Sequence, residues 1–141
     1  GRKCKAGFVQ SGDYCFQVDA TRGNFSEKIS SCLSLGGHLV KVDSAEKNSA
    51  MKSYIKGYGT YIRDAYIGLR DIIGDNKLSS YKWIVDNATL AYSNFYPTQP
   101  SSTSQRCVVM GPDSYDRKWF DFECSYPTLA ICEGAYEWYY Y

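Results

Sequence analysis

The first stretch of the chain with a regular hydrophobic pattern begins at Asn24 and has the period of a helix. Asn24 and Glu27, three residues apart, match a capping box, and Gly36-Gly37 is a typical helix end. The apolar positions recur at intervals of three and four and fall on one face: Phe25, Ile29, Cys32 and Leu33. We therefore predict a helix from Asn24 to Leu35.

A second helical pattern follows, with Ser44 as its N-cap and Gly57 and Gly59 at its end. Its apolar stripe consists of Met51, Tyr54, Ile55 and Tyr58. This spacing predicts a helix from Ser44 to about Lys56, and core packing explains the stripe better than a ligand does.

Most of the remaining apolar residues occur in short runs that favour strands. The runs are Tyr14 to Val18, His38 to Val42, Ala65 to Leu69, Tyr81 to Trp83, Arg106 to Met110, Lys118 to Asp121 and Leu129 to Glu133. Helices early and strands late indicate an α+β fold. Between Ser93 and Gln105 the chain is rich in polar residues and proline, which predicts a long surface loop. Loops of this length often carry function, so this loop is the candidate site.

Composition narrows the class of protein. The chain has 141 residues, which fits one domain over 1–141, and no apolar stretch approaches the roughly 20 residues of a membrane span. The 16 basic and 15 acidic residues nearly balance and form no basic run. We therefore expect no membrane insertion and no nucleic-acid partner.

The cysteines indicate disulfides. There are six of them, no two are spaced as Cys-x-x-Cys, and the chain has one histidine, which disfavours a zinc site. Counting alone leaves fifteen possible pairings. Disulfides imply an oxidising compartment, so we expect a secreted protein seen in its mature form, without a signal peptide. Asn24 and Asn87 begin glycosylation sequons, and a glycan on Asn24 would compete with its capping role.

Motifs along nearly the whole chain resemble those of the C-type lectin-like domains. They occur in the family's order: Cys4-x-x-Gly7-Phe8 with Tyr14-Cys15-Phe16, Cys32-x-x-x-Gly36-Gly37-His38-Leu39-Val40, Asp43-Ser44-Ala45-Glu46, Tyr66-Ile67-Gly68-Leu69, Trp119-Phe120-Asp121-Phe122-Glu123-Cys124 and Leu129-Ala130-Ile131-Cys132-Glu133. The resemblance implies the long form of the fold, with two helices, two small antiparallel sheets and a long loop. It also implies three disulfides: Cys4 with Cys15, Cys32 with Cys132, and Cys107 with Cys124.

In sugar-binding members of this family, a calcium ion on the long loop binds the sugar hydroxyls. The matching positions here are Gln99, Pro100, Ser101, Gln105, Phe120 and Asp121, and the resemblance implies that Gln99-Pro100 is cis. Among the positions where the family supplies acidic ligands, Asp121 alone keeps a carboxylate, and calcium prefers about 6 to 8 oxygen ligands. We therefore expect a carbohydrate site that works with little or no calcium, for galactose-like or N-acetylated sugars. Tyr96, Tyr115 and Phe120 would add a stacking face.

The resemblance implies two further calcium locations, and both have lost ligands. One would use Asp71, Asp75, Ser102, Gln105 and Arg106, but a guanidinium has no lone pair for a cation. The other retains Asp43 and Glu133, with Lys47 where an acid would help. We expect no required cofactor, with Asp43 and Glu133 as the remaining candidate metal ligands.

Other functions have less support in the sequence. His38 lies in an apolar strand, and the acidic residues near the end of the chain read as turn or strand-edge positions, so we do not expect an enzyme. Protein recognition without sugar binding is the alternative, because residues 134–141 form an aromatic tail that would suit a homodimer interface or else be disordered. Ice binding also occurs on this fold, but no flat threonine array is apparent.

Overall fold

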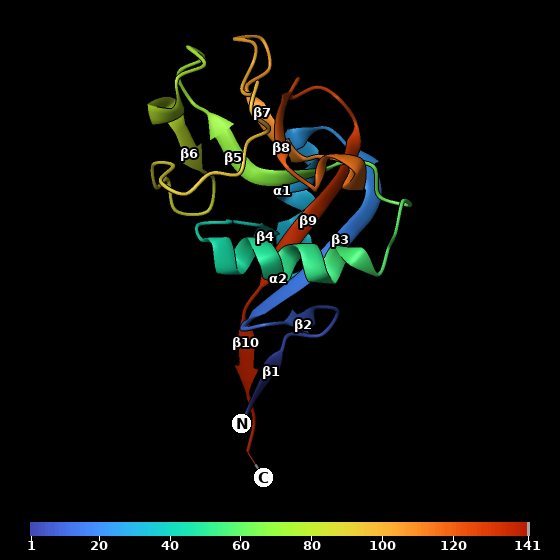
Figure 1. Cartoon of the computed structure of the whole chain (residues 1–141). Helices are drawn as coiled ribbons and strands as arrows, with labels where there is room; N and C mark the ends of the chain where they lie inside the picture. The colour runs from blue at the N-terminus through green and yellow to red at the C-terminus, as the bar shows by residue number, and fades with distance from the viewer. Residues whose placement is uncertain (141) are drawn as a thin grey trace.

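The computed structural model describes residues 1–140 and has an α+β architecture around one large sheet (Figure 1). Two helices, α1 (Phe25–Ser34) and α2 (Ala45–Lys56), cover opposite faces of the sheet. The strands are β1 (Arg2–Cys4), β2 (Val9–Ser11), β3 (Tyr14–Gly23), β4 (His38–Leu39), β5 (Ala65–Asp71), β6 (Tyr81–Trp83), β7 (Cys107–Met110), β8 (Trp119–Phe122), β9 (Thr128–Gly134) and β10 (Tyr136–Trp138). Two short 3-10 helices, Leu78–Ser80 and Asp113–Tyr115, lie in connections.

The main sheet has eight strands in the order β2-β3-β9-β5-β7-β8, with β4 on β9 and β6 on β5. All of its pairs are antiparallel except β5 with β9, which joins the two halves. One buried cluster packs α2 against the sheet around Met51, Ile55 and Trp119, and a second packs α1 around Phe25 and Tyr66. The long loop leads into β7, which lies next to the edge strand β8. The candidate site therefore lies near that edge of the sheet.

Both predicted helices are confirmed, and so is the capping box. The Glu27 N–H donates to Asn24 Oδ1 at 2.9 Å, and the Asn24 N–H donates to Glu27 Oε1 at 2.9 Å. Because the cap uses Oδ1 and a glycan attaches to Nδ2, a glycan on Asn24 does not have to displace the cap, contrary to our expectation. Ser44 caps α2 by accepting from the Lys47 N–H at 3.1 Å.

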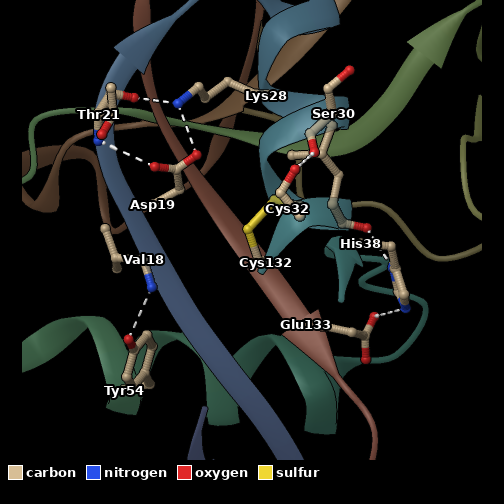
Figure 2. Close-up of a disulfide and its surroundings, with 12 residues drawn as sticks. Val18, Asp19, Thr21, Lys28, Ser30, Cys32, His38, Tyr54, Cys132 and Glu133 are labelled. Carbon is tan, nitrogen blue, oxygen red and sulfur yellow. Dashed lines mark hydrogen bonds and ion pairs between the residues drawn. A yellow bond between two sulfur atoms is a disulfide. The ribbon is translucent and has the colours of Figure 1, made fainter. Parts of the chain in front are cut away.

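The three disulfides have the pairing that the resemblance implied. Cys32 on α1 is bonded to Cys132 on β9, which ties residues 100 positions apart at the centre of the fold (Figure 2). Cys107 and Cys124 join the start of β7 to the residues after β8, beside the long loop. The disulfide between Cys4 and Cys15 joins β1 to β3.

The motif Tyr66-Ile67-Gly68-Leu69 occupies the middle of β5, where backbones approach closely. A Cβ on Gly68 would lie 2.9 Å from the Leu39 carbonyl, so only glycine fits. Tyr66 is fully buried, and its hydroxyl can donate to the carbonyl of Tyr126 or of Glu123. Burial raises the pKa of Tyr66 above its ordinary value, which keeps this hydroxyl protonated as a donor.

The aromatic tail, 134–141, is a structural element that the sequence did not predict. Within it, β10 pairs with β1 to form a two-stranded ribbon that points away from the main sheet and carries both ends of the described chain (Figure 1). The Arg2 guanidinium lies 4.0 Å from the ring centre of Tyr136 and covers it. Trp138 is 74% exposed and Tyr140 is 95% exposed, while Tyr141 lies outside the described residues.

Candidate functional site

The carboxylate of Asp121 holds the long loop together. It points inward from β8 and is 3% exposed. One oxygen accepts the N–H groups of Ser101 and Ser102, at 2.7 and 2.9 Å, and the other accepts the Ser101 hydroxyl at 3.0 Å. These charge-assisted bonds occupy both carboxylate oxygens, so Asp121 positions the loop instead of facing a ligand as we expected.

Gln99 and Gln105 lie on either side of this clamp. The side-chain oxygen of Gln99, Oε1, accepts the Asp121 N–H at 3.2 Å, and the Gln99-Pro100 peptide bond is cis, as the resemblance implied. Gln105 Oε1 lies 3.5 Å from the exposed Ser101 hydroxyl. Both glutamines are half-buried and keep their NH₂ groups as donors, which suits hydroxyl or acetamido oxygens of a ligand.

Three aromatic rings form a platform beside the clamp, as predicted. Tyr96 and Phe120 are stacked with their ring centres 5.2 Å apart. Tyr115 packs edge-on against both, at 5.3 and 5.6 Å. The Gln99 N–H donates to the Tyr96 carbonyl, which connects the loop backbone at the clamp to the platform. Phe120 and Asp121 are successive residues of β8 and point to opposite faces of the sheet. An aromatic surface beside a few placed polar groups is the usual composition of a small-ligand site.

Arg106 occupies the first of the neighbouring calcium locations. Its Nε donates to the Asp71 carbonyl at 3.1 Å and its Nη2 to the Ile72 carbonyl at 2.8 Å. The Asp71 carboxylate is buried and accepts the N–H groups of Ile73, Gly74 and Asn76. Hydrogen bonds from Ser80 and Lys77 lower the pKa of the Asp75 carboxyl, so it is an anion at neutral pH. At this calcium location, the positively charged Arg106 guanidinium thus forms hydrogen bonds with two backbone carbonyl oxygens.

Lys47 occupies the other calcium location. Its ammonium lies 2.8 Å from Glu133 Oε1 and 2.6 Å from Oε2, and the same carboxylate accepts the Lys41 N–H at 3.0 Å. His38 Nε2 lies 3.8 Å from Glu133 Oε1 on its other side (Figure 2). Asp43, the second candidate ligand, is exposed and lies 3.8 Å from the Lys41 ammonium. The charge of Glu133 is therefore neutralised within the protein.

These donor sets do not fit a calcium ion. Calcium needs several uncommitted oxygens, and its affinity rises with the number of carboxylates. Here both oxygens of Asp121 accept hydrogen bonds from the loop, Glu133 is paired with Lys47, and Arg106 bonds the carbonyls of Asp71 and Ile72. Among residues 1–140 there is no group of three His, Cys, Asp or Glu residues that could hold a metal.

The remaining candidate residues lie apart from the loop. His38 Nδ1 lies 2.8 Å from the Leu39 carbonyl, and its Nε2 lies 3.8 Å from the Glu133 carboxylate, which is paired with Lys47. Asn87 is exposed in a turn with a positive φ of 60°, and Asn24 is half-buried at the start of α1.

The chain matches the family model described as the Lectin C-type domain over residues 21–134. Perlucin from Haliotis laevigata is 25% identical over 136 residues, which cover 92% of this chain and 82% of perlucin. Among solved structures, a calcium-independent type II antifreeze protein is 27% identical with a TM-score of 0.76, covering 97% of this chain and 98% of that one. Human lithostathine has a TM-score of 0.80 at 23% identity, covering 93% and 98%.

Proposed function

The chain belongs to the Lectin C-type domain family, and we propose that it is a carbohydrate-binding lectin whose long loop binds sugar without calcium. One observation carries this proposal. The clamp on Asp121 gives the loop a fixed shape through hydrogen bonds and needs no metal ion for this. A loop ordered in this way loses little entropy on binding a ligand.

The neighbouring calcium locations support the same proposal. At each of them a basic side chain of the protein, Arg106 or Lys47, bonds the oxygens that a cation would need. For calcium to bind, these side chains would have to be displaced and their partners left without hydrogen bonds. We therefore propose that the protein has no metal cofactor.

The platform and the glutamines define the class of sugar. A pyranose presents an apolar face of C–H groups that can stack on Tyr96, Phe120 and Tyr115, and hydroxyl groups at its rim. The NH₂ groups of Gln99 and Gln105 are donors that suit ring hydroxyls or an acetamido carbonyl. We propose terminal galactose-like or N-acetylated hexosamine residues on glycans or glycoproteins as ligands. The proposal assigns no catalytic activity.

A glycan array tests the proposal when it is run with calcium and again with excess chelator. We expect the same terminal sugars to bind in both arms. Binding that disappears with chelator would refute calcium independence, and an absence of binding in both arms would refute the lectin function in favour of a protein ligand. Gln99→Ala should weaken binding in the chelator arm, whereas Lys5→Gln, at the other end of the molecule, should not.

Ice binding competes with this proposal because similar proteins include the type II antifreeze structure. A thermal-hysteresis measurement on the intact protein separates the two functions. We expect no hysteresis above that of an unrelated protein at equal concentration, because the long loop presents amides and aromatic rings in place of a flat repetitive surface.

The ribbon of β1 and β10 supports a homodimer. A two-stranded ribbon leaves both of its edges unpaired, and the exposed Trp138 and Tyr140 side chains form an apolar surface on it. We propose that two copies associate through this ribbon. Sedimentation equilibrium should give a dimer for the wild type and a monomer for Trp138→Ser with Tyr140→Ser. A monomeric wild type, or a dimeric variant, would refute the role of the ribbon.

We also propose that the protein is secreted. The three disulfides require an oxidising compartment, and both sequons lie where the enzyme that adds glycans could reach them in such a compartment. Among the described residues, no helix is long and apolar enough to cross a membrane.

A further inference from the structure

Two neighbouring arginines, one of which lines a hollow together with rings of the aromatic platform, form no ion pair in the described part of the chain. Arg22 is near the end of β3 and Arg63 directly precedes β5, and both are exposed. Among residues 1–140, neither guanidinium forms an ion pair with a carboxylate. Both arginines line a polar hollow of about 120 Å³ together with Tyr61 and Tyr126. Tyr61 and Tyr126 are 75% and 46% exposed, so accessible aromatic residues share this hollow with the arginines.

Arg63 also lines a second hollow, of about 160 Å³, whose walls are largely apolar. Its walls include Val109, Tyr115, Phe120 and Phe122. Tyr115 and Phe120 belong to the aromatic platform as well, so the platform, the apolar hollow and the arginines form one continuous surface. Asp64 lies between the hollows, and one of its oxygens accepts the Thr128 hydroxyl at 2.6 Å, which leaves the other for a ligand hydroxyl.

Another hollow, of about 520 Å³, is lined by one ammonium group that forms no ion pair among the described residues, that of Lys56. It lies beside α2, and the Lys52 ammonium in it is bound by Asp116 at 2.7 Å. The Arg117 guanidinium is buried and donates to the carbonyls of Ile62 and Gly59, at 2.7 and 3.0 Å. Its donors serve the fold, so Lys56, which shares this hollow with the Asp113 carboxylate, is the cation left to attract an anion there. Two guanidinium groups line the hollow at Arg22 and Arg63, which makes it the better site for an anion.

We propose that Arg22 and Arg63 bind the carboxylate or sulfate group of an acidic glycan whose neighbouring sugar lies on the aromatic platform. Guanidinium groups match the geometry of these anions and bind them through paired hydrogen bonds. The apolar hollow receives an apolar group of the same ligand, such as the methyl of an acetamido group. This inference rests on the proposed function and specifies its ligand as an oligosaccharide with an acidic residue.

Titration calorimetry in chelator at low salt tests the inference with three forms of one N-acetylated oligosaccharide: neutral, sialylated and sulfated. We expect at least one acidic form to bind about tenfold more tightly than the neutral form, and high salt to remove most of the difference. Arg22→Gln, whose side chain lines the polar hollow and not the apolar one, should bring the affinity for the acidic form down toward that for the neutral form. Lys5→Gln removes one exposed positive charge at the other end of the molecule and should change neither.

Each remaining outcome has a distinct meaning. Equal affinity for the neutral and acidic forms overturns the acidic-ligand inference and leaves the lectin function standing. Hexaglutamate that binds as tightly as the acidic sugar also overturns it, because the arginines would then attract any polyanion. If no oligosaccharide binds, the proposed function and the inference both fail.

Discussion

The Lys47 ammonium on α2 contacts both carboxylate oxygens of Glu133 on β9, at 2.8 and 2.6 Å. Lys47 is 7% exposed, so this ion pair is largely shielded from water and joins a helix to the central sheet. Its energetic role can be separated from that of an exposed pair, because the same helix carries Lys52, which pairs with the exposed Asp116.

Lys47→Met should lower the free energy of unfolding by about 2–3 kcal/mol, because the Glu133 carboxylate, whose side chain is 13% exposed, loses its counter-ion and keeps the Lys41 N–H as a donor. Urea denaturation measures the loss. The double variant Lys47→Met with Glu133→Leu should lose less than the single variant, since no charge is then stranded. Lys52→Met is the matched control and should lose far less, because its pair is exposed. If Lys47→Met and Lys52→Met lowered the free energy of unfolding equally, burial would not determine how much an ion pair contributes to stability.

Asp121→Asn should loosen the long loop. An amide can keep one oxygen for the Ser101 and Ser102 N–H groups, but it lacks the charge that strengthens both bonds, and its NH₂ group replaces the oxygen that accepts the Ser101 hydroxyl. We expect faster proteolytic cleavage within residues 101–105, weaker glycan binding, and a loss of stability of about 1.5–3 kcal/mol. Glu123→Gln alters the exposed carboxylate just after β8 and should leave all three unchanged. A cleavage rate unaffected by Asp121→Asn would contradict the clamp.

The sequence predicts those features that depend on local pattern. The helix beginning at Asn24 was correct because its cap and its apolar face lie within a dozen residues. The disulfide pairing followed from the resemblance. The ribbon was missed because β1 and β10 are three residues each and pair across nearly the whole chain, and such short runs have no periodicity of their own.

The candidate site was predictable in composition but not in orientation. The sequence placed Asp121 on the loop face, whereas strand alternation turns Phe120 outward and Asp121 inward to meet the serine N–H groups. The surface at Arg22 and Arg63 has no motif, because its residues come from separate strands and connections that only the sheet brings together.

The buried pair of Asp19 and Lys28 should make stability depend on acid pH (Figure 2). Burial by itself would raise the pKa of Asp19, but hydrogen bonds from Lys28, Ser31 and the Thr21 N–H outweigh it, so the pKa is lowered below its ordinary value of 3.8. A lowered pKa stabilises the fold above pH 3.8, and this contribution is lost as the pH falls below 3.8 through the folded pKa.

Asp19→Asn removes the ionisable group, and its unfolding free energy should therefore vary less with pH in that range than that of the wild type. Denaturant titrations at a series of pH values below and above 3.8 measure the two slopes. Asp13→Asn, an exposed carboxylate in the hairpin before β3, serves as the control and should keep the wild-type slope. Parallel curves for Asp19→Asn and the wild type would contradict the assigned role of the pair.

Removing the disulfide between Cys32 and Cys132 should destabilise the protein more than removing the one between Cys4 and Cys15. The first closes a loop of 100 residues and the second a loop of 11. In the chain-entropy account, a longer loop restricts the unfolded chain more, which gives about 4.7 kcal/mol for the first and less than about 3 kcal/mol for the second. Paired Cys→Ala variants, unfolded in urea, measure both losses. Losses of equal size would mean that residual structure in the unfolded chain, and not loop length, sets the contribution of each bond.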